Sequence, residues 1–130
     1  MANYKMTNSE SEEQQTLFQW AEYMIHAYPQ LALMYHVPNG GARSAGTAGR
    51  LKAEGVKSGV PDICLPAPSG IYHGMYIELK VKPNRPTLEQ KWWLEQLSNA
   101  GYFTCVCYGW EEASSTIEKY LSLHDGEKYE

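Results

Sequence analysis

Two carboxylates and a lysine stand in this sequence in an order and spacing suited to metal-assisted phosphodiester cleavage. Asp62 follows Pro61, and Glu78 and Lys80 lie two residues apart after a glycine-containing turn. Because side chains alternate faces along a strand, Glu78 and Lys80 are expected to point the same way. Opposite charges on one face of an otherwise apolar strand break the usual pattern, and such breaks are expected at functional sites.

Hydrolysis of a phosphodiester at neutral pH requires an activated water and relief of charge at the phosphoryl group. A divalent cation held by carboxylates supplies both, and hard oxygen ligands suit Mg²⁺ or Mn²⁺. Asp62 and Glu78 lie on adjacent predicted strands, so their oxygens can converge on one ion. The backbone carbonyl of Leu79 is a candidate third ligand. Lys80 would polarise the attacking water or neutralise the phosphate.

Each part of this pattern also has an ordinary interpretation. An Asp after Pro is often a turn residue, and a Glu-x-Lys pair on a strand is often a solvent-facing salt bridge. The two parts in this order, each beside apolar residues, favour the metal site instead. The histidines, among them His36, are interpreted as ordinary surface or core residues because they lack partners at metal-ligand spacing.

The net charge of −4 conceals a basic middle section. Between His36 and Trp92 the chain carries eight basic and four acidic residues, a local balance of +4, while the remainder sums to −8. A solvated surface is the plain alternative. A basic stretch around an acidic pair is nevertheless typical of a phosphate-binding groove at a metal site.

Length and composition predict one compact domain covering residues 1–130, with residues 1–8 and 125–130 loosely ordered. No apolar run approaches the roughly 18 residues that span a bilayer, and the polar start does not resemble a secretory signal. The odd number of cysteines and the lack of a CxxC motif favour buried, reduced thiols at Cys64, Cys105 and Cys107. A cytoplasmic protein is expected.

The apolar periodicity and the turn residues predict an α/β domain with a mixed sheet covered by helices. Helices are expected from residue 9 or 11 to 28, and over residues 43–54, 87–99 and 111–123. Strands are expected over residues 31–37, 62–65, 71–81 and 102–108. The run of residues 46–52 lacks the order of a phosphate-binding P-loop, so no nucleotide cofactor is expected.

Four blocks of this sequence, taken in order, resemble the VRR-NUC branch of the PD-(D/E)xK nucleases. The blocks are Pro38-Asn39-Gly40-Gly41, residues 54–62 ending in Pro61-Asp62, Glu78-Leu79-Lys80-Val81, and residues 85–90. The similarity runs from about residue 11 to residue 121. It implies a restriction-endonuclease-like core and a Mg²⁺- or Mn²⁺-dependent DNA endonuclease. Standalone phage and bacterial members further imply a homodimer acting on branched DNA such as four-way (Holliday) junctions.

The resemblance also implies roles for individual residues. Asp62 and Glu78 match the metal ligands, and Lys80 matches the catalytic lysine. An acidic residue of the first helix, Glu12 or Glu13, completes the site; Glu12 aligns better, while Glu13 lies one turn before Leu17 on the apolar face. The basic residues predicted to contact DNA are Arg43, Lys57, Lys82 and Arg85.

Some alternatives stay open at this point. Gln90 matches a polar residue that faces the site, but Thr87-Leu88-Glu89-Gln90 is also a capping box, and the two roles are equally supported. Trp92 and Trp93 are expected to be buried against the sheet or a dimer partner rather than to stack on bases. The alternative function is a catalytically inactive DNA-binding module of the same fold, and a third is a small-molecule-binding domain.

Overall fold

A computed structural model describes residues 2–38 and 44–130 of the chain. Its elements follow the predicted order, with one additional short helix. They are α1 (Ala2–Met24), the 3-10 helix η1 (Pro29–Leu33), β1 (Tyr35–His36), α2 (Ala45–Ala53), β2 (Ile63–Leu65), β3 (Met75–Lys80), α3 (Leu88–Asn99), β4 (Phe103–Tyr108) and α4 (Trp110–Leu121).

The four strands form one mixed sheet in the order β1-β2-β3-β4. The β1–β2 and β2–β3 pairs are antiparallel, and β3 pairs with β4 in parallel. A parallel pair needs a long crossover, and α3 supplies it between β3 and β4. The prediction of an α/β fold with a mixed sheet is therefore confirmed.

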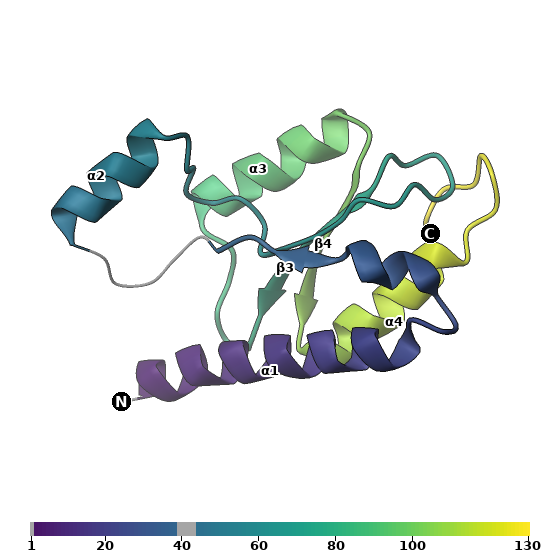
Figure 1. Ribbon diagram of the computed structural model, residues 1–130, viewed down its shortest axis with the longest axis horizontal. Coiled ribbons are helices and arrows are strands. Elements are labelled where there is room, and N and C mark those ends of the chain that lie inside the picture. Colours follow the sequence, from purple (N-terminus) through teal and green to yellow (C-terminus); the bar gives the residue numbers. More distant parts are fainter. Residues whose placement is uncertain (1, 39–43) are drawn as a thin grey trace.

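The helices lie on both faces of the sheet. Figure 1 shows α3 on one face and α1 with α4 together on the other, while α2 projects away from the sheet. Neither α2 nor α3 contains a buried residue. The face of the sheet covered by α3 is therefore packed much more loosely than the opposite face.

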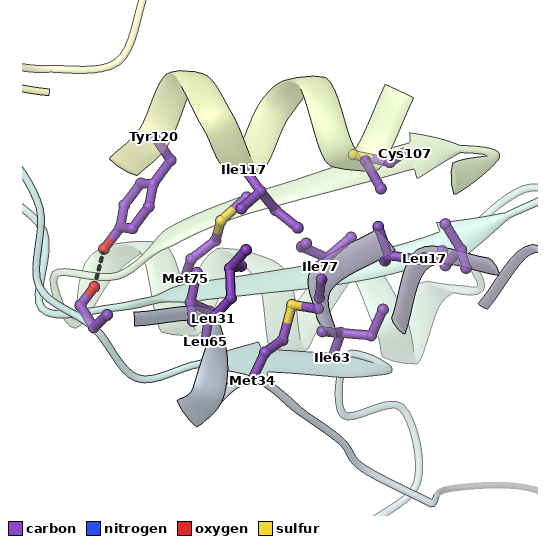
Figure 2. Packing of buried hydrophobic residues seen from close by; sticks show 14 residues of the cluster. Leu17, Leu31, Met34, Ile63, Leu65, Met75, Ile77, Cys107, Ile117 and Tyr120 are labelled. Carbon is purple, nitrogen blue, oxygen red and sulfur yellow. Dashed lines mark hydrogen bonds between the residues drawn. The ribbon is translucent and has the colours of Figure 1, made fainter. Parts of the chain in front are cut away.

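The hydrophobic core fills the space between the sheet and the α1–α4 pair (Figure 2). Along β3, Met75, Ile77 and Leu79 point into this core. Because side chains alternate, Tyr76, Glu78 and Lys80 point to the α3 face. The other core residues come from α1, η1 and the residue after it, β2 and the loop after it, β4 and α4, and they are Leu17, Ala21, Leu31, Met34, Ile63, Leu65, Ala67, Cys107, Ala113, Ile117 and Tyr120.

The structure corrects two predicted elements near the N-terminus. Helix α1 begins at Ala2, before the predicted cap at residue 9 or 11, because no Gly or Pro interrupts residues 2–24. The strand predicted over residues 31–37 is instead η1 followed by the two-residue strand β1. Pro29 stands at the first turn of η1, where its fixed φ favours a helical start.

The cysteines are free, as predicted. Cys64 and Cys107 are buried, whereas Cys105 is half-buried, with its Sγ 3.7 Å from that of Cys107. No helix in the described part of the chain is long and apolar enough to cross a membrane.

A buried hydrogen bond anchors the end of α4 to the loop after β2. The Tyr120 hydroxyl donates to the Ala67 carbonyl at 2.7 Å, as Figure 2 shows. We expect Tyr120→Phe to lower the free energy of unfolding by about 1 kcal/mol, because it removes the donor and retains the ring. Urea denaturation measures this change. Tyr23→Phe, at a side chain that is 77% exposed, is the matched control and should change nothing; equal stability of the two variants would contradict the assignment.

Candidate active site

The pairing of β2 with β3 brings Asp62 opposite Glu78. Ile63 pairs with Ile77 and Cys64 with Tyr76, so one further step in the same register places Asp62 across from Glu78. Directly opposed side chains on one face have Cβ atoms about 5 Å apart. Both carboxylates, together with Lys80, therefore gather on the α3 face of the sheet, where β2 begins and β3 ends.

A side-chain hydrogen bond holds Asp62 against β3. Its Oδ2 accepts the backbone N–H of Leu79 at 2.9 Å, which leaves Oδ1 to face other partners. The register continued by two residues places Pro61 opposite Leu79. Since proline has no N–H, Pro61 cannot donate to the Leu79 carbonyl as a ladder partner would. The Pro61-Asp62 pair thus suits the predicted use of that carbonyl as a ligand.

Glu78 is the most constrained group of the site. Its residue is only 1% exposed, and its Oε1 has no hydrogen-bond partner. Its Oε2 lies 3.5 Å from the Nζ of Lys80, a residue that is 9% exposed. Burial, followed by the charge of Asp62, raises the pKa of Glu78 to about 8, although Lys80 opposes the shift.

Asp62 has a similar but better compensated environment. Burial raises the pKa of Asp62, whereas the Leu79 amide, Glu78 and the Lys80 charge act to lower it. Two buried carboxyl groups side by side are costly unless a positive charge compensates them. Lys80 supplies part of this positive charge, and additional positive charge would compensate the two carboxyl groups further.

His36 is a member of the site that sequence reasoning missed. Its Nδ1 lies 2.9 Å from the backbone carbonyl oxygen of Asp62, and the Val37 N–H donates to the same oxygen at 2.7 Å. The imidazole therefore helps to hold the backbone that carries Asp62. Because the contact comes from pairing of β1 with β2, metal-ligand spacing in the sequence could not have revealed it.

The N-terminal glutamates do not join Asp62 and Glu78. Glu12 is exposed, and the Oε1 of Glu13 accepts the backbone N–H of Trp110 at 2.8 Å, at the start of α4. No group of three or more His, Cys, Asp or Glu side chains in residues 2–38 and 44–130 is arranged to hold a metal ion. Of the predicted ligands, the structure thus brings together the carboxylates of Asp62 and Glu78, with Leu79 next to Glu78 in the chain, and their binding of a metal ion stays a prediction.

The capping interpretation of Gln90 is confirmed. Thr87 Oγ1 accepts the Gln90 N–H at 3.1 Å, and Gln90 Oε1 accepts the Thr87 N–H at 2.8 Å. This oxygen is therefore occupied in starting α3. A contact of Gln90 with substrate stays a prediction.

The predicted DNA contacts fall in different places. Lys57, Lys82 and Arg85 are exposed, with Lys57 beside α3 and Lys82 close to Glu13 and Glu112. Arg43 and residues 39–41 of the glycine-containing turn lie outside the described residues. Trp92 is 55% exposed, so it is not buried against the sheet, and its burial against a dimer partner stays a prediction.

The residues present fit a hard divalent cation. The Oε1 of Glu78 is buried without a partner, the pKa of Glu78 is raised by burial and by Asp62, and the two carboxylates are opposed, so a positive charge would be favourable between them. Oxygen donors of this kind suit Mg²⁺ or Mn²⁺, which retain several waters when few protein ligands are available.

A mixed sheet with helices on both faces and an Asp, Glu and Lys gathered at adjacent strands define the class of restriction-endonuclease-like α/β domains. A family model of the VRR-NUC domain matches residues 8–111, and the chain belongs to this family. A solved structure described as a VRR-NUC domain protein is 28% identical, with a TM-score of 0.73, and the match covers 90% of this chain and 91% of that chain. No curated protein matches the chain. Membership of the family implies a nuclease with DNA as its substrate.

The contact of Glu13 with Trp110 predicts a structural role. The residue before α4, Gly109, provides no side-chain cap, so Glu13 satisfies an amide at the positive end of that helix. We expect Glu13→Ala to lower the free energy of unfolding by about 1 kcal/mol, measured by urea denaturation. Glu12→Ala is the matched control and should leave stability unchanged. If Glu12→Ala alone lost stability, Glu12 and not Glu13 would be the residue that stabilises the start of α4.

Proposed function

We propose that this protein is a Mg²⁺- or Mn²⁺-dependent DNA endonuclease that cleaves branched DNA, such as four-way (Holliday) junctions, as a homodimer. The observation that carries the proposal is the buried pair of opposed carboxylates beside Lys80, with Glu78 Oε1 lacking a partner. The free cysteines fit a reducing compartment, such as the cytosol of a bacterium or of a phage-infected host.

Asp62, Glu78 and the Leu79 carbonyl would hold the cation. When bound, a cation of this type lowers the pKa of a coordinated water and offsets charge on a phosphoryl oxygen. The hydrogen bond from the Leu79 amide fixes the Asp62 carboxylate, so Oδ1 keeps its direction when substrate arrives. Burial of Glu78 excludes solvent that would otherwise weaken its attraction for the cation.

Lys80 would act on the substrate directly. It leaves the same face of β3 as Glu78, and its Nζ is held near Glu78 Oε2. From this position the ammonium can donate to a phosphate oxygen or orient the attacking water. Its three N–H donors and single positive charge also reduce the repulsion between the carboxylates and an approaching phosphate.

The symmetry of the substrate and the small surface that a chain of this size offers to DNA are the reasons for proposing a homodimer. A four-way junction has two-fold symmetry, and a closed C₂ dimer would present two identical sites to it. The exposed basic residues Lys57, Lys82 and Arg85 would then contact phosphates around each site.

Removal of either ionisable group of β3 should strongly reduce cleavage. We expect Glu78→Gln and Lys80→Ala to reduce cleavage of labelled junction and flap DNA by about 10²-fold or more, because each removes a group acting at the reacting phosphate. Gel assays with Mg²⁺, Mn²⁺ or chelator measure the rates. Glu111→Gln and Lys128→Ala, at exposed positions, are the matched controls and should cleave like the original protein.

Cleavage that persists in chelator, or in both β3 variants, would contradict the nuclease proposal. DNA binding without cleavage under every condition would support the inactive module instead. Light scattering on the same samples tests the dimer: symmetric junction cutting by a protein that is monomeric at micromolar concentration would contradict the proposed assembly.

A further inference from the structure

A groove lies between α2 and α3, on the side of the sheet that also carries the candidate active site. Its volume is about 780 Å³. The residues that define its chemistry come from α2, the segment after it and α3, and they are Leu51, Lys52, Val56, Lys57, Trp92 and Trp93. The groove thus combines two aromatic rings with two cations.

Trp92 and Trp93 have different environments in the groove. The Trp93 indole donates to the Ser58 carbonyl at 3.1 Å, which fixes it between α3 and the segment after α2. The ring of Trp92 stands perpendicular to it, at 5.5 Å between centroids, and its residue is 55% exposed. A fixed ring therefore supports a second ring that offers its surface to solvent.

The charge around the groove favours an anionic occupant with a flat apolar part. Lys52 and Lys57 are both exposed, and Glu89 is the acidic residue among the described residues that line it. A nucleotide has this composition, because its base presents a π-face and its phosphates carry negative charge. Stacking of bases on aromatic side chains beside basic residues is how proteins hold unpaired nucleic acid.

The groove is close to the candidate active site along the chain. Ser58 precedes Asp62 by four residues, which can span at most about 14 Å. The groove therefore lies within about four nucleotide steps of Asp62, taking about 3.4 Å for each step. Gly59 keeps this segment against α3, because a Cβ there would lie 3.0 Å from the Glu89 side chain and 3.1 Å from Trp93.

We infer that this groove binds an unpaired nucleobase of the DNA substrate, stacked on Trp92, with Lys52 and Lys57 holding the adjacent phosphates. The inference rests on the proposed nuclease function and deepens it. A duplex keeps its bases stacked inside, whereas a flap, or a junction whose base pairs open at the branch point, exposes them. The groove would thereby select DNA with unpaired nucleotides near the scissile phosphate.

The test measures binding separately from cleavage. Fluorescence anisotropy of a labelled oligothymidine in chelator, at fixed salt, gives the affinity of each protein for single-stranded DNA. We expect Trp92→Ala to weaken this binding about tenfold, and Trp92→Phe, which retains a stacking ring, to weaken it much less. Leu88→Ala, on the same helix and 85% exposed but outside the lining, is the matched control and should bind normally. Affinity for a blunt duplex should not change in any variant.

Three results would overturn the inference. The first is that Trp92→Ala binds oligothymidine as tightly as the original protein, and the second is that it loses affinity for the blunt duplex to the same degree. The third is that Trp92→Ala separates a dimer into monomers in light scattering, which would identify the groove as an interface between copies of the chain. The two proposals fail independently. If Trp92→Ala binds oligothymidine more weakly but the original protein cleaves no DNA in Mg²⁺ or Mn²⁺, the proposed groove is supported and the proposed nuclease function is rejected. If the original protein cleaves DNA with metal but Trp92→Ala binds oligothymidine normally, only the proposed role of the groove is rejected.

Discussion

The hydrogen bond from the Leu79 amide to Asp62 Oδ2 is the interaction on which the site depends. It stands in for a ladder bond immediately before β2 begins, because a side-chain oxygen accepts the N–H of β3 there. Pro61, which has no N–H, in turn leaves the Leu79 carbonyl without the ladder donor that another residue at this position would supply. The Pro61-Asp62 pair therefore directly precedes β2, fixes a carboxylate and suits a backbone oxygen to serve as a ligand.

The fold accommodates the buried carboxylate pair because the two faces of the sheet are packed differently. The face toward α1 and α4 is closely packed with aliphatic side chains, together with Tyr120 (Figure 2). The other face carries Asp62, Glu78 and Lys80 and is covered by α3, none of whose residues is buried. A buried carboxylate pair opposes folding, so the apolar face must supply the stability that the functional face lacks. The same loose covering leaves the α2–α3 groove open to solvent.

Local signals in the sequence predicted the parts of the structure that depend on neighbouring residues. The alternation along Met75–Lys80 placed Glu78 and Lys80 on one face, and the Thr87–Gln90 spacing predicted the capping box that the structure contains. The parts that were missed depend on contacts between distant segments. Glu13 contacts Trp110 across 97 residues, and His36 reaches Asp62 only through strand pairing. Periodicity carries no information on such contacts, and it equally could not show that α3 leaves Trp92 in solvent.

The central claim is that Asp62 and Glu78 together form a divalent-cation site. Isothermal titration calorimetry with Mn²⁺ at pH 7 tests it most directly, in buffers of different ionisation enthalpy. The account predicts a saturable site accompanied by proton release, because burial and Asp62 raise the pKa of Glu78, and any proton that Glu78 holds must leave when the cation binds. Glu78→Gln should lose this site. An absence of Mn²⁺ binding in the original protein, or unchanged binding in Glu78→Gln, would contradict the claim.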